Sequence, residues 1–368
     1  MPENPTLNNA TANNDPHYFH AEAYALTANL TAPFEAQIRK QASVKLEGDS
    51  QKVLLEGEEQ KRLKEKKTPD NYFSEHPRPY RFEGLFSYSA AHTQVSGHRS
   101  KKIDGAFVTL ATSVVENLNV LNVVTADKVV AQISTTHLPD QYSPKVTFLG
   151  THFENLRIAN HKVNPALKLD VVGDPPQRAK ADEPHKYYLP HGTTLIQSLE
   201  KQYDKWQRGF EAFLSKIEEK HRERLRADDS WPCNSYYRVP NLLTDAIEKD
   251  AAIFAQKDRE REAPVSNGTK WKGLTCSLVE HVDIEDIRVP VRTENPKEPD
   301  IVHHPPAHCL GNVIHIKDFG TIFLAELRVN HNSFHLTMIR AEMGCIADGS
   351  GSFSSCIVNG GGKGSGGH

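Results

Sequence analysis

Hydrophobic and polar residues alternate along two long parts of the chain, one before residue 164 and one after residue 310. In residues 129–135, one set of side chains (Val, Ala, Ile, Thr) alternates with a second set (Val, Gln, Ser), which is a period of two. Residues 21–30 alternate in the same way and place Tyr24, Leu26 and Leu30 on one side of a half-buried strand. Short runs of this kind, separated by Gly, Asn and Asp, predict an antiparallel sandwich- or barrel-like β domain.

The period changes to that of a helix in the middle of the chain. Residues 193–227 predict one helix, with a capping box at its start, and residues 241–262 predict a second helix that begins at Asn241. Together they predict a helical hairpin. The apolar stripe of the first helix has members three and four residues apart: Leu195, Leu199, Tyr203, Trp206, Phe210, Phe213 and Ile217.

The two periods define the predicted organisation, an α+β but mainly β fold in which a helical hairpin interrupts the β domain. The strongest β pattern covers about 81–163 and 311–359. Two separate domains with a break near residue 165 are the alternative. The predicted parts are a mobile arm at 1–16, the first part of the β domain at 17–163, the insertion at 164–310, the second part of the β domain at 311–359, and a Gly-rich tail at 360–368.

The composition excludes some classes of function. A net charge of −3 provides no overall field that would attract nucleic acid or anionic lipid. The basic run at 61–67 directly follows Glu56, Glu58 and Glu59, so we interpret it as a solvated segment. No stretch has the length and hydrophobicity of a membrane span, and the N-terminal residues do not resemble a signal peptide. We therefore expect a cytoplasmic protein by default, with export by a route that needs no signal left open.

The chain has five cysteines and no CxxC pair, which argues against a zinc ribbon or a thioredoxin-like site. Cys345 and Cys356 are close enough in sequence to close a small loop. In a reducing cytosol, small buried hydrophobic residues are the favoured interpretation of these cysteines.

Two stretches of the chain, VENLNVLN at 115–122 and FENLRIAN at 153–160, repeat one pattern. Asn tolerates left-handed backbone geometry, so the asparagines predict matching structural turns on two related strands. These asparagines are Asn117, Asn122, Asn155 and Asn160. The paired Glu116 and Glu154 are the alternative, as an acid/base or cation-binding pair, but no His or Asp accompanies both at the same offset.

The best candidate for chemistry is the sequence HHPPAHC, which contains His303, His304, His308 and Cys309. Imidazole and thiolate groups are suitable ligands for zinc, so these residues are the predicted metal ligands if a metal is bound. An exposed loop is the simpler interpretation, because two prolines separate the histidines. The sequence has no nucleophile elbow, phosphate-binding loop or dinucleotide-binding motif, so we predict no catalytic residue and no organic cofactor.

Three short blocks resemble uncharacterised bacterial β-rich proteins and, more distantly, choice-of-anchor surface proteins. The first block includes Thr125, Ala126, Asp127 and Val129; the second includes Leu156, Ile158 and Val163; the third includes Gly320, Thr321, Leu324 and Glu326. The resemblance covers about a third of the chain and implies a β domain without catalytic residues. This chain differs in having a helical insertion and no export signal.

Two hypotheses of function follow. The first is a non-catalytic binding or assembly protein, with a protein partner or a homo-oligomer and an interface that includes Trp206, Phe210 and Phe213. The second is a metal-dependent hydrolase that uses the histidine cluster, with a carboxylate such as Glu326 as the base. The absence of catalytic motifs favours the first hypothesis.

Overall fold

The computed structural model describes fewer residues than the sequence contains. The described residues are 17–49, 71–75, 79–138, 144–174, 201–202, 204, 208, 211, 274–284, 289–290, 301–302, 307–316, 319–330, 333–344 and 348–359. Most of them lie in β-strands that pair antiparallel, as the alternating pattern predicts. Among these residues no helix has both the length and the hydrophobicity needed to cross a membrane.

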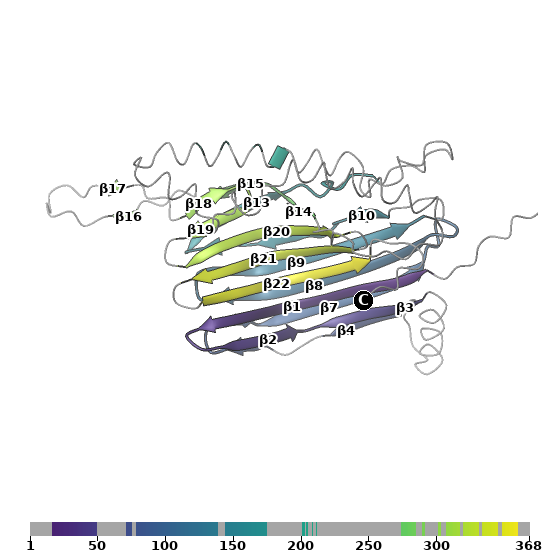
Figure 1. The fold of residues 1–368 in the computed structure, drawn as a ribbon, viewed down its shortest axis with the longest axis horizontal. Coiled ribbons are helices and arrows are strands. Elements are labelled where there is room, and N and C mark those ends of the chain that lie inside the picture. The colour runs from purple at the N-terminus through teal and green to yellow at the C-terminus, as the bar shows by residue number, and fades with distance from the viewer. Residues whose placement is uncertain are drawn as a thin grey trace, which may run out of the picture.

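The strands form two large sheets that pack face to face, with their strands along the long axis of the molecule (Figure 1). Sheet A has nine strands, with β18-β19-β20-β21-β22-β1-β2 as its order, β14 paired to β20 and β3 paired to β1. Its strands are β1 Tyr18–Ala32, β2 Ala36–Gln41, β3 Val44–Asp49, β14 Leu274–Ser277, β18 Ala307–Leu310, β19 Val313–Ile316, β20 Gly320–Asn330, β21 Ser333–Gly344 and β22 Asp348–Asn359. Strands from the two ends of the predicted β domain, β1–β3 and β19–β22, are therefore combined in one sheet.

Sheet B has eleven strands, with the order β15-β13-β12-β9-β8-β6-β5; β10 and β11 also pair with β9, and β7 joins β8 to β4. Its strands are β4 Asn71–Glu75, β5 Tyr80–Phe82, β6 Phe86–Tyr88, β7 Ala90–Arg99, β8 Phe107–Val120, β9 Val124–His137, β10 Lys145–Thr147, β11 His152–Glu154, β12 Arg157–Ile158, β13 His161–Leu167 and β15 Val279–Ile284. A separate pair contains β16 Val289–Pro290 and β17 Ile301–Val302.

One continuous segment joins the two sheets at an edge. Strand β14 pairs with β20 of sheet A, and strand β15, which begins two residues later, pairs with β13 of sheet B. Leu278 lies between them and bonds to both sides: its N–H donates to the Ala325 carbonyl at 2.9 Å, and its carbonyl accepts from the Lys168 N–H at 2.6 Å. The sandwich is therefore closed along this edge, in the manner of a barrel. These strands lie inside the segment that the sequence pattern assigned to the insertion.

The middle of the sandwich is thin because small side chains face one another there. Ala23 of sheet A and Ala111 and Ala131 of sheet B are fully buried. Serine side chains then reach directly from one sheet to the backbone of the other. The Ser113 hydroxyl donates to the Tyr24 carbonyl at 3.0 Å, and the Ser354 hydroxyl donates to the Ser113 carbonyl at 2.9 Å.

A row of irregular positions crosses four neighbouring strands of sheet A. Ala25, Ser354, Met338 and Ala325 are each skipped in the pairing of their strands, and Ser354 and Ala325 have positive φ values of 51° and 45°. At each skipped residue the alternation of inward and outward side chains is interrupted, so a different set of side chains faces the core on each side of it.

The prediction that Tyr24, Leu26 and Leu30 share one side is therefore wrong for Tyr24. Leu26 and Leu30 are buried in the core, but the irregular position at Ala25 lies between them and Tyr24. The Tyr24 ring lies instead on the outer face of sheet A, with the Lys40 ammonium 4.8 Å from its centre.

The repeated E-N-L pattern is a structural device, as predicted. Asn117 and Asn155 occupy matching places beside β9 and have φ values of 51° and 49°, while Asn122 and Asn160 end matching turns with φ values of 56° and 65°. Left-handed geometry at Asn117 lets both Val115 and Leu118 face the core, although they are three residues apart.

The paired glutamates of the repeat do not face each other. Both Glu116 and Glu154 lie opposite Lys128 of β9, on its two sides, and the Glu154 carboxylate is 3.7 Å from the Lys128 ammonium. A positive charge therefore separates the two carboxylates, which does not favour the alternative of a shared proton or cation.

The described residues between 201 and 211 are helical. They are Lys201, Gln202, Asp204, Arg208 and Glu211. The Gln202 side chain forms two hydrogen bonds with the edge of sheet A. Its amide nitrogen donates to the Ser277 carbonyl at 2.7 Å, and its amide oxygen accepts from the Ser277 N–H at 3.1 Å. The remainder of the predicted hairpin lies outside the described residues.

Gly320 and Gly349 lie so close to the backbone of a neighbouring strand that no side chain fits at either position. Gly320 has a φ of 131°, and a Cβ atom there would lie 2.0 Å from the Glu342 carbonyl oxygen; Gly349 has a φ of 140°, and its Cβ would lie 2.2 Å from the Asn29 carbonyl oxygen. We expect Gly320→Ala or Gly349→Ala to lower the free energy of unfolding by at least about 2 kcal/mol, measured by urea denaturation. Gly344→Ala is the control, since nothing lies within 4 Å of its Cβ position. Equal effects at Gly320 and Gly344 would contradict the strand geometry.

Candidate functional site

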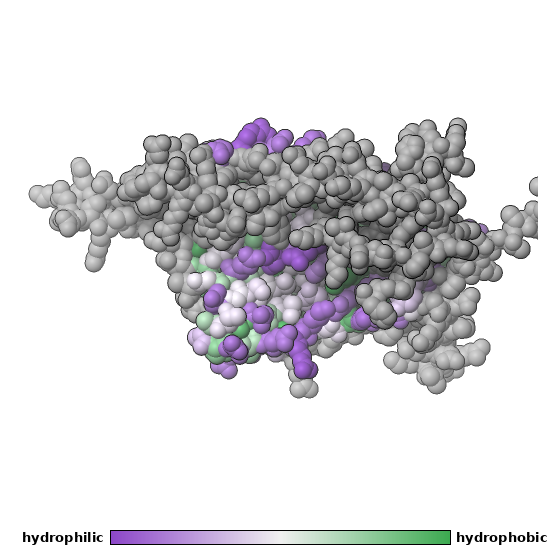
Figure 2. All heavy atoms as spheres, viewed as in Figure 1, coloured by the Kyte–Doolittle hydropathy of each residue, from purple (hydrophilic) through white to green (hydrophobic). Residues whose placement is uncertain are grey.

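The outer face of sheet A, which points away from sheet B, carries a connected group of polar side chains. Hydrophilic residues cross the visible part of this face, and hydrophobic residues show only in small separate groups (Figure 2). Inward-pointing residues of the same strands, such as Cys356 and Ser354, contact sheet B. Side chains one position away, such as Ser355, therefore point outward.

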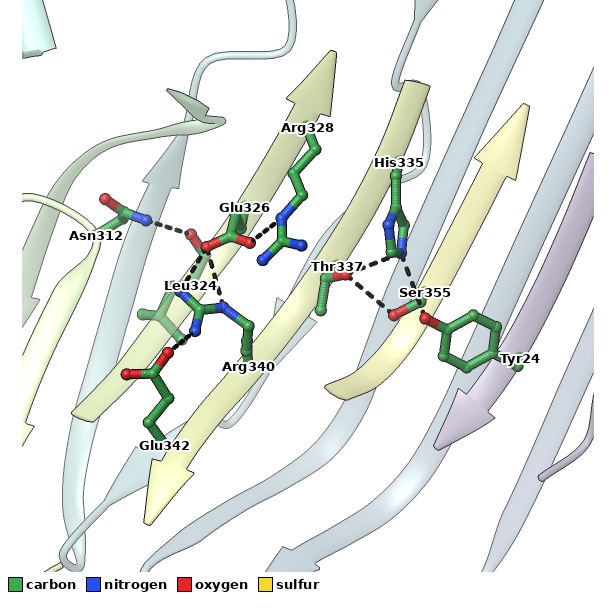
Figure 3. A network of polar contacts seen from close by, with 10 residues as sticks. All are labelled: Tyr24, Asn312, Leu324, Glu326, Arg328, His335, Thr337, Arg340, Glu342 and Ser355. Carbon is green, nitrogen blue, oxygen red and sulfur yellow. Dashed lines mark hydrogen bonds and ion pairs between the residues drawn. The ribbon is translucent and has the colours of Figure 1, made fainter. Parts of the chain in front are cut away.

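Glu326 of β20 is the centre of an ion-pair network on this face (Figure 3). One carboxylate oxygen accepts from Nε of Arg328 at 2.9 Å, and the other accepts from Nε and Nη2 of Arg340 at 3.1 and 2.8 Å. The Glu326 side chain is only 3% exposed. Because a buried carboxylate is stable only when its charge is compensated, the two guanidinium groups are what permits Glu326 at this position.

Arg340 of β21 is held from two further sides. Its guanidinium lies 3.5 Å from the centre of the Phe323 ring, the residue directly opposite on β20, and its Nη1 donates to the Glu342 carboxylate. Arg340 is 10% exposed and Glu342 is 51% exposed, so the network extends from a buried centre to solvent. Stacking on an aromatic ring and bonding to two carboxylates use most of the donors of a guanidinium.

A second group of polar side chains continues across the sheet from β21 to β1 (Figure 3). Nε2 of His335 lies 3.3 Å from the Tyr24 hydroxyl and 3.2 Å from the Thr337 hydroxyl, which accepts from the Ser355 hydroxyl at 3.2 Å. Burial, together with the nearby Arg328, lowers the pKa of His335 to about 4, and burial raises the pKa of Tyr24. Both rings are therefore neutral at pH 7.

The geometry of these two groups is that of a structural network. Each oxygen of Glu326 already accepts from a guanidinium, so this carboxylate is poorly placed to act as the base of the predicted hydrolase. The buried cysteines are not activated nucleophiles either. Burial raises the pKa of the Cys276 thiol to about 12 and also raises that of the Cys356 thiol, so both thiols stay protonated.

The structure describes few of the predicted metal ligands. His303 and His304 lie outside the described residues, and His308 and Cys309 are consecutive positions of β18, whose backbone alone is described. Within the described ranges, no three His, Cys, Asp or Glu side chains are grouped as a metal site would require. The zinc site stays a prediction.

The predicted interface residues Trp206, Phe210 and Phe213 also lie outside the described residues, as does Cys345. Cys356 is a free cysteine that is fully buried and donates from its thiol to the Ala131 carbonyl. The interpretation of this cysteine as a small buried residue is therefore confirmed, and a loop closed by a disulfide with Cys345 is not formed.

The arginines and the histidine of the network were not predicted from the sequence. A signal was present: in residues 333–344, polar side chains alternate with apolar ones, and the charged residues of 326–328 and 340–342 are each two apart. That spacing predicts charges on one face of a strand. It does not predict which strands are neighbours, and Tyr24 and His335 are 311 residues apart.

Comparison with known protein families gives one match. The model of a domain of unknown function, DUF8256, matches residues 71–330, which is more than half of the chain. The chain belongs to the DUF8256 family. No curated protein and no solved structure matches it.

The DUF8256 region does not contain all of the folded β domain. It includes the eleven strands of sheet B, but β1, β2, β3, β21 and β22 of sheet A lie outside residues 71–330. Glu326 and Arg328 belong to the matched region, whereas Arg340, His335 and Tyr24 do not. The polar network therefore joins the DUF8256 region to the strands that complete the sandwich.

The buried histidines predict a loss of stability in acid. Burial gives both His335 and His17 a pKa of about 4 in the folded state. This value is below the pKa of 6.5 that each has in the unfolded state. The unfolded state therefore binds protons first, so stability is full above pH 6.5 and falls as the pH drops toward 4, by about 3 kcal/mol for each histidine. We expect His335→Gln to remove about half of this pH dependence, and His17→Gln together with His335→Gln to remove most of it, in urea denaturation at a series of pH values. An unchanged pH dependence in the double variant would rule out this assignment.

The ion-pair network predicts unequal effects for its two carboxylates. Glu326→Ala leaves Arg340 with one fewer partner in a buried position, so we expect it to lower the free energy of unfolding by about 3 kcal/mol. Glu342→Ala is the matched control, since the half-exposed Glu342 is expected to contribute less than about 1 kcal/mol. Thermal and urea unfolding of both variants measure the difference. If both variants behave alike, Glu326 is not the centre of the network.

Proposed function

We propose that this DUF8256 protein is a non-catalytic binding or assembly protein that acts through its β domain. The observation that carries the proposal is the state of the polar residues on sheet A. The side chains there that could perform chemistry are engaged with one another, and Glu326 spends both oxygens on arginines. Such a network stabilises a rigid surface, which suits binding better than proton transfer.

We also propose that the segment at 164–310 adds a helical hairpin at the edge of the β domain. Two observations on the described residues support it. Lys201, Asp204, Arg208 and Glu211 are exposed and are spaced by three and four residues, as on one face of a helix. Gln202, on the other side, holds Ser277 at the edge of sheet A. The stripe with Trp206, Phe210 and Phe213 has the spacing to share the side of Gln202 and is the proposed contact with the β domain or a partner.

The resemblance to choice-of-anchor surface proteins agrees with a binding role and stays a proposal. The alternative function, a metal-dependent hydrolase, keeps His303, His304 and His308 as its ligands. It requires a base other than Glu326, or a rearranged network.

Metal content distinguishes the two functions. We expect purified full-length protein to contain less than stoichiometric zinc, and His303→Ala with His308→Ala to leave the zinc content and the melting temperature unchanged, because a structural zinc site would contribute strongly to folding. Elemental analysis and thermal unfolding with and without a chelator are the measurements. Stoichiometric zinc that is lost in the variant would overturn the binding proposal in favour of the hydrolase.

A further inference from the structure

The outer face of sheet B presents a regular grid of side chains from strands β7, β8, β9 and the neighbouring β10 and β11. The alternate residues Thr109, Ala111 and Ser113 of β8 are fully buried, so the residues between them point outward. Strand pairing aligns five rows across the strands. From one end, the rows are centred on Lys128, Val130, Gln132, Ser134 and Thr136 of β9.

The three middle rows carry no carboxylate, ammonium or guanidinium group. They consist of Val, Leu, Thr, Ser, Gln and His, and most of these side chains, including Leu110, Thr112 and Val114, are partly exposed. A sheet face that is uncharged at its centre shares one property with the core of a protein interface, the depletion of charged residues.

The charges lie at the two ends of the grid and have opposite signs. The first row has two carboxylates, Glu116 and Glu154, and one ammonium, Lys128, which gives a net charge of −1. The last row has one ammonium, Lys145, and no carboxylate, which gives +1. Among the described contacts within the chain, Lys145 bonds only to Asp174, which is highly exposed. At the other end of the grid, Arg157 of β12 lies beyond the acidic row.

The two charged ends are placed symmetrically about the middle row. Lys128 and Thr136 are each four residues from Gln132 along β9, Glu154 lies opposite Lys128, and Lys145 lies opposite Thr136. A second copy turned by a twofold axis that runs across the strands through Gln132 would place its own strand β9 antiparallel to this one. Glu154 of each copy would then meet Lys145 of the other. Their long side chains tolerate the angle at which stacked sheets usually cross.

The area of the grid is sufficient for a stable dimer. Four strands about 4.8 Å apart and five rows about 6.8 Å apart cover on the order of 650 Å² in each copy. Two such faces bury roughly 1,300 Å² in total, which lies within the usual range of specific interfaces.

We propose that the outer face of sheet B is a self-association surface, on which a second copy of this chain stacks about a twofold axis through Gln132. The occupant is a second copy because the arrangement of charge is complementary to itself: the acidic row of one copy matches the basic row of the other. This inference rests on the proposed binding or assembly function and names its partner.

Charge reversal in the full-length protein tests the arrangement. We expect wild-type protein to show a monomer–dimer equilibrium in light scattering and sedimentation over a series of concentrations. Glu154→Lys and Lys145→Glu each create two like-charge contacts in the dimer, so each variant alone should raise the dissociation constant roughly tenfold. The double variant, and an equal mixture of the two single variants, should return to within roughly twofold of wild type, because opposite charges meet again. Glu35→Lys, on the exposed turn between β1 and β2, is the control and should have no effect.

Three outcomes would overturn the inference. One is a protein that stays monomeric at every concentration, and another is an oligomer that neither reversal weakens. In the third, both reversals weaken the dimer but the mixture is not rescued, which excludes the twofold arrangement. Circular dichroism of each variant checks that the monomer is folded. Zinc content tests the proposed function independently of these variants. An oligomer that the charge reversals do not weaken would therefore exclude the outer face of sheet B as the interface but would not exclude an assembly role.

Discussion

Direct hydrogen bonds between the two sheets are the constraint on which the rest of this structure depends. Stacked sheets usually lie about 10 Å apart, with large side chains between them. Here the Ser113 and Ser354 hydroxyls reach the backbone of the opposite sheet, and this is possible only because alanines surround them. A larger residue at Ala23, Ala111 or Ala131 would separate the sheets and leave buried hydroxyls and carbonyls without partners.

The close contact of the sheets also explains where large and charged residues are found. Bulky rings pack beside this contact: the rings of Phe86 in sheet B and Phe353 in sheet A have centres 5.6 Å apart. Polar side chains of the central strands are placed on the outer face of sheet A, where they compensate one another. The irregular row has a related effect, because it changes which side chains face the core along four neighbouring strands. This row contains Ala25, Met338, Ser354 and Ala325.

Much of the fold could be predicted from local patterns, and the predictions failed where a pattern is interrupted, too short or dependent on distant parts of the chain. Alternation correctly identified β9, and Asn122 and Asn160 of the E-N-L repeat correctly indicated left-handed turns, whereas Asn117 has left-handed geometry inside β8. Alternation failed at Tyr24, where one skipped residue reversed the facing of the strand. It also missed β14 and β15, which are too short for their period to be evident between prolines and charged residues. The candidate site was less predictable still, since Glu326, Arg340, His335 and Tyr24 meet only through strand neighbours that the sequence does not specify.

The position of β1 has a consequence for how the protein is made. This N-terminal strand lies between β22, one of the last strands of the domain, and the short strands β2 and β3. While the ribosome is still synthesising the chain, β1 therefore lacks the partner along most of one edge, and its buried alanines and leucines have no completed core to enter. Long-range pairing of this kind is slow and leaves strand edges exposed in the meantime. Nascent chains of this protein should accordingly depend on chaperones until residue 359 has left the ribosomal tunnel, and truncation within β22 should affect solubility as severely as deletion of β1.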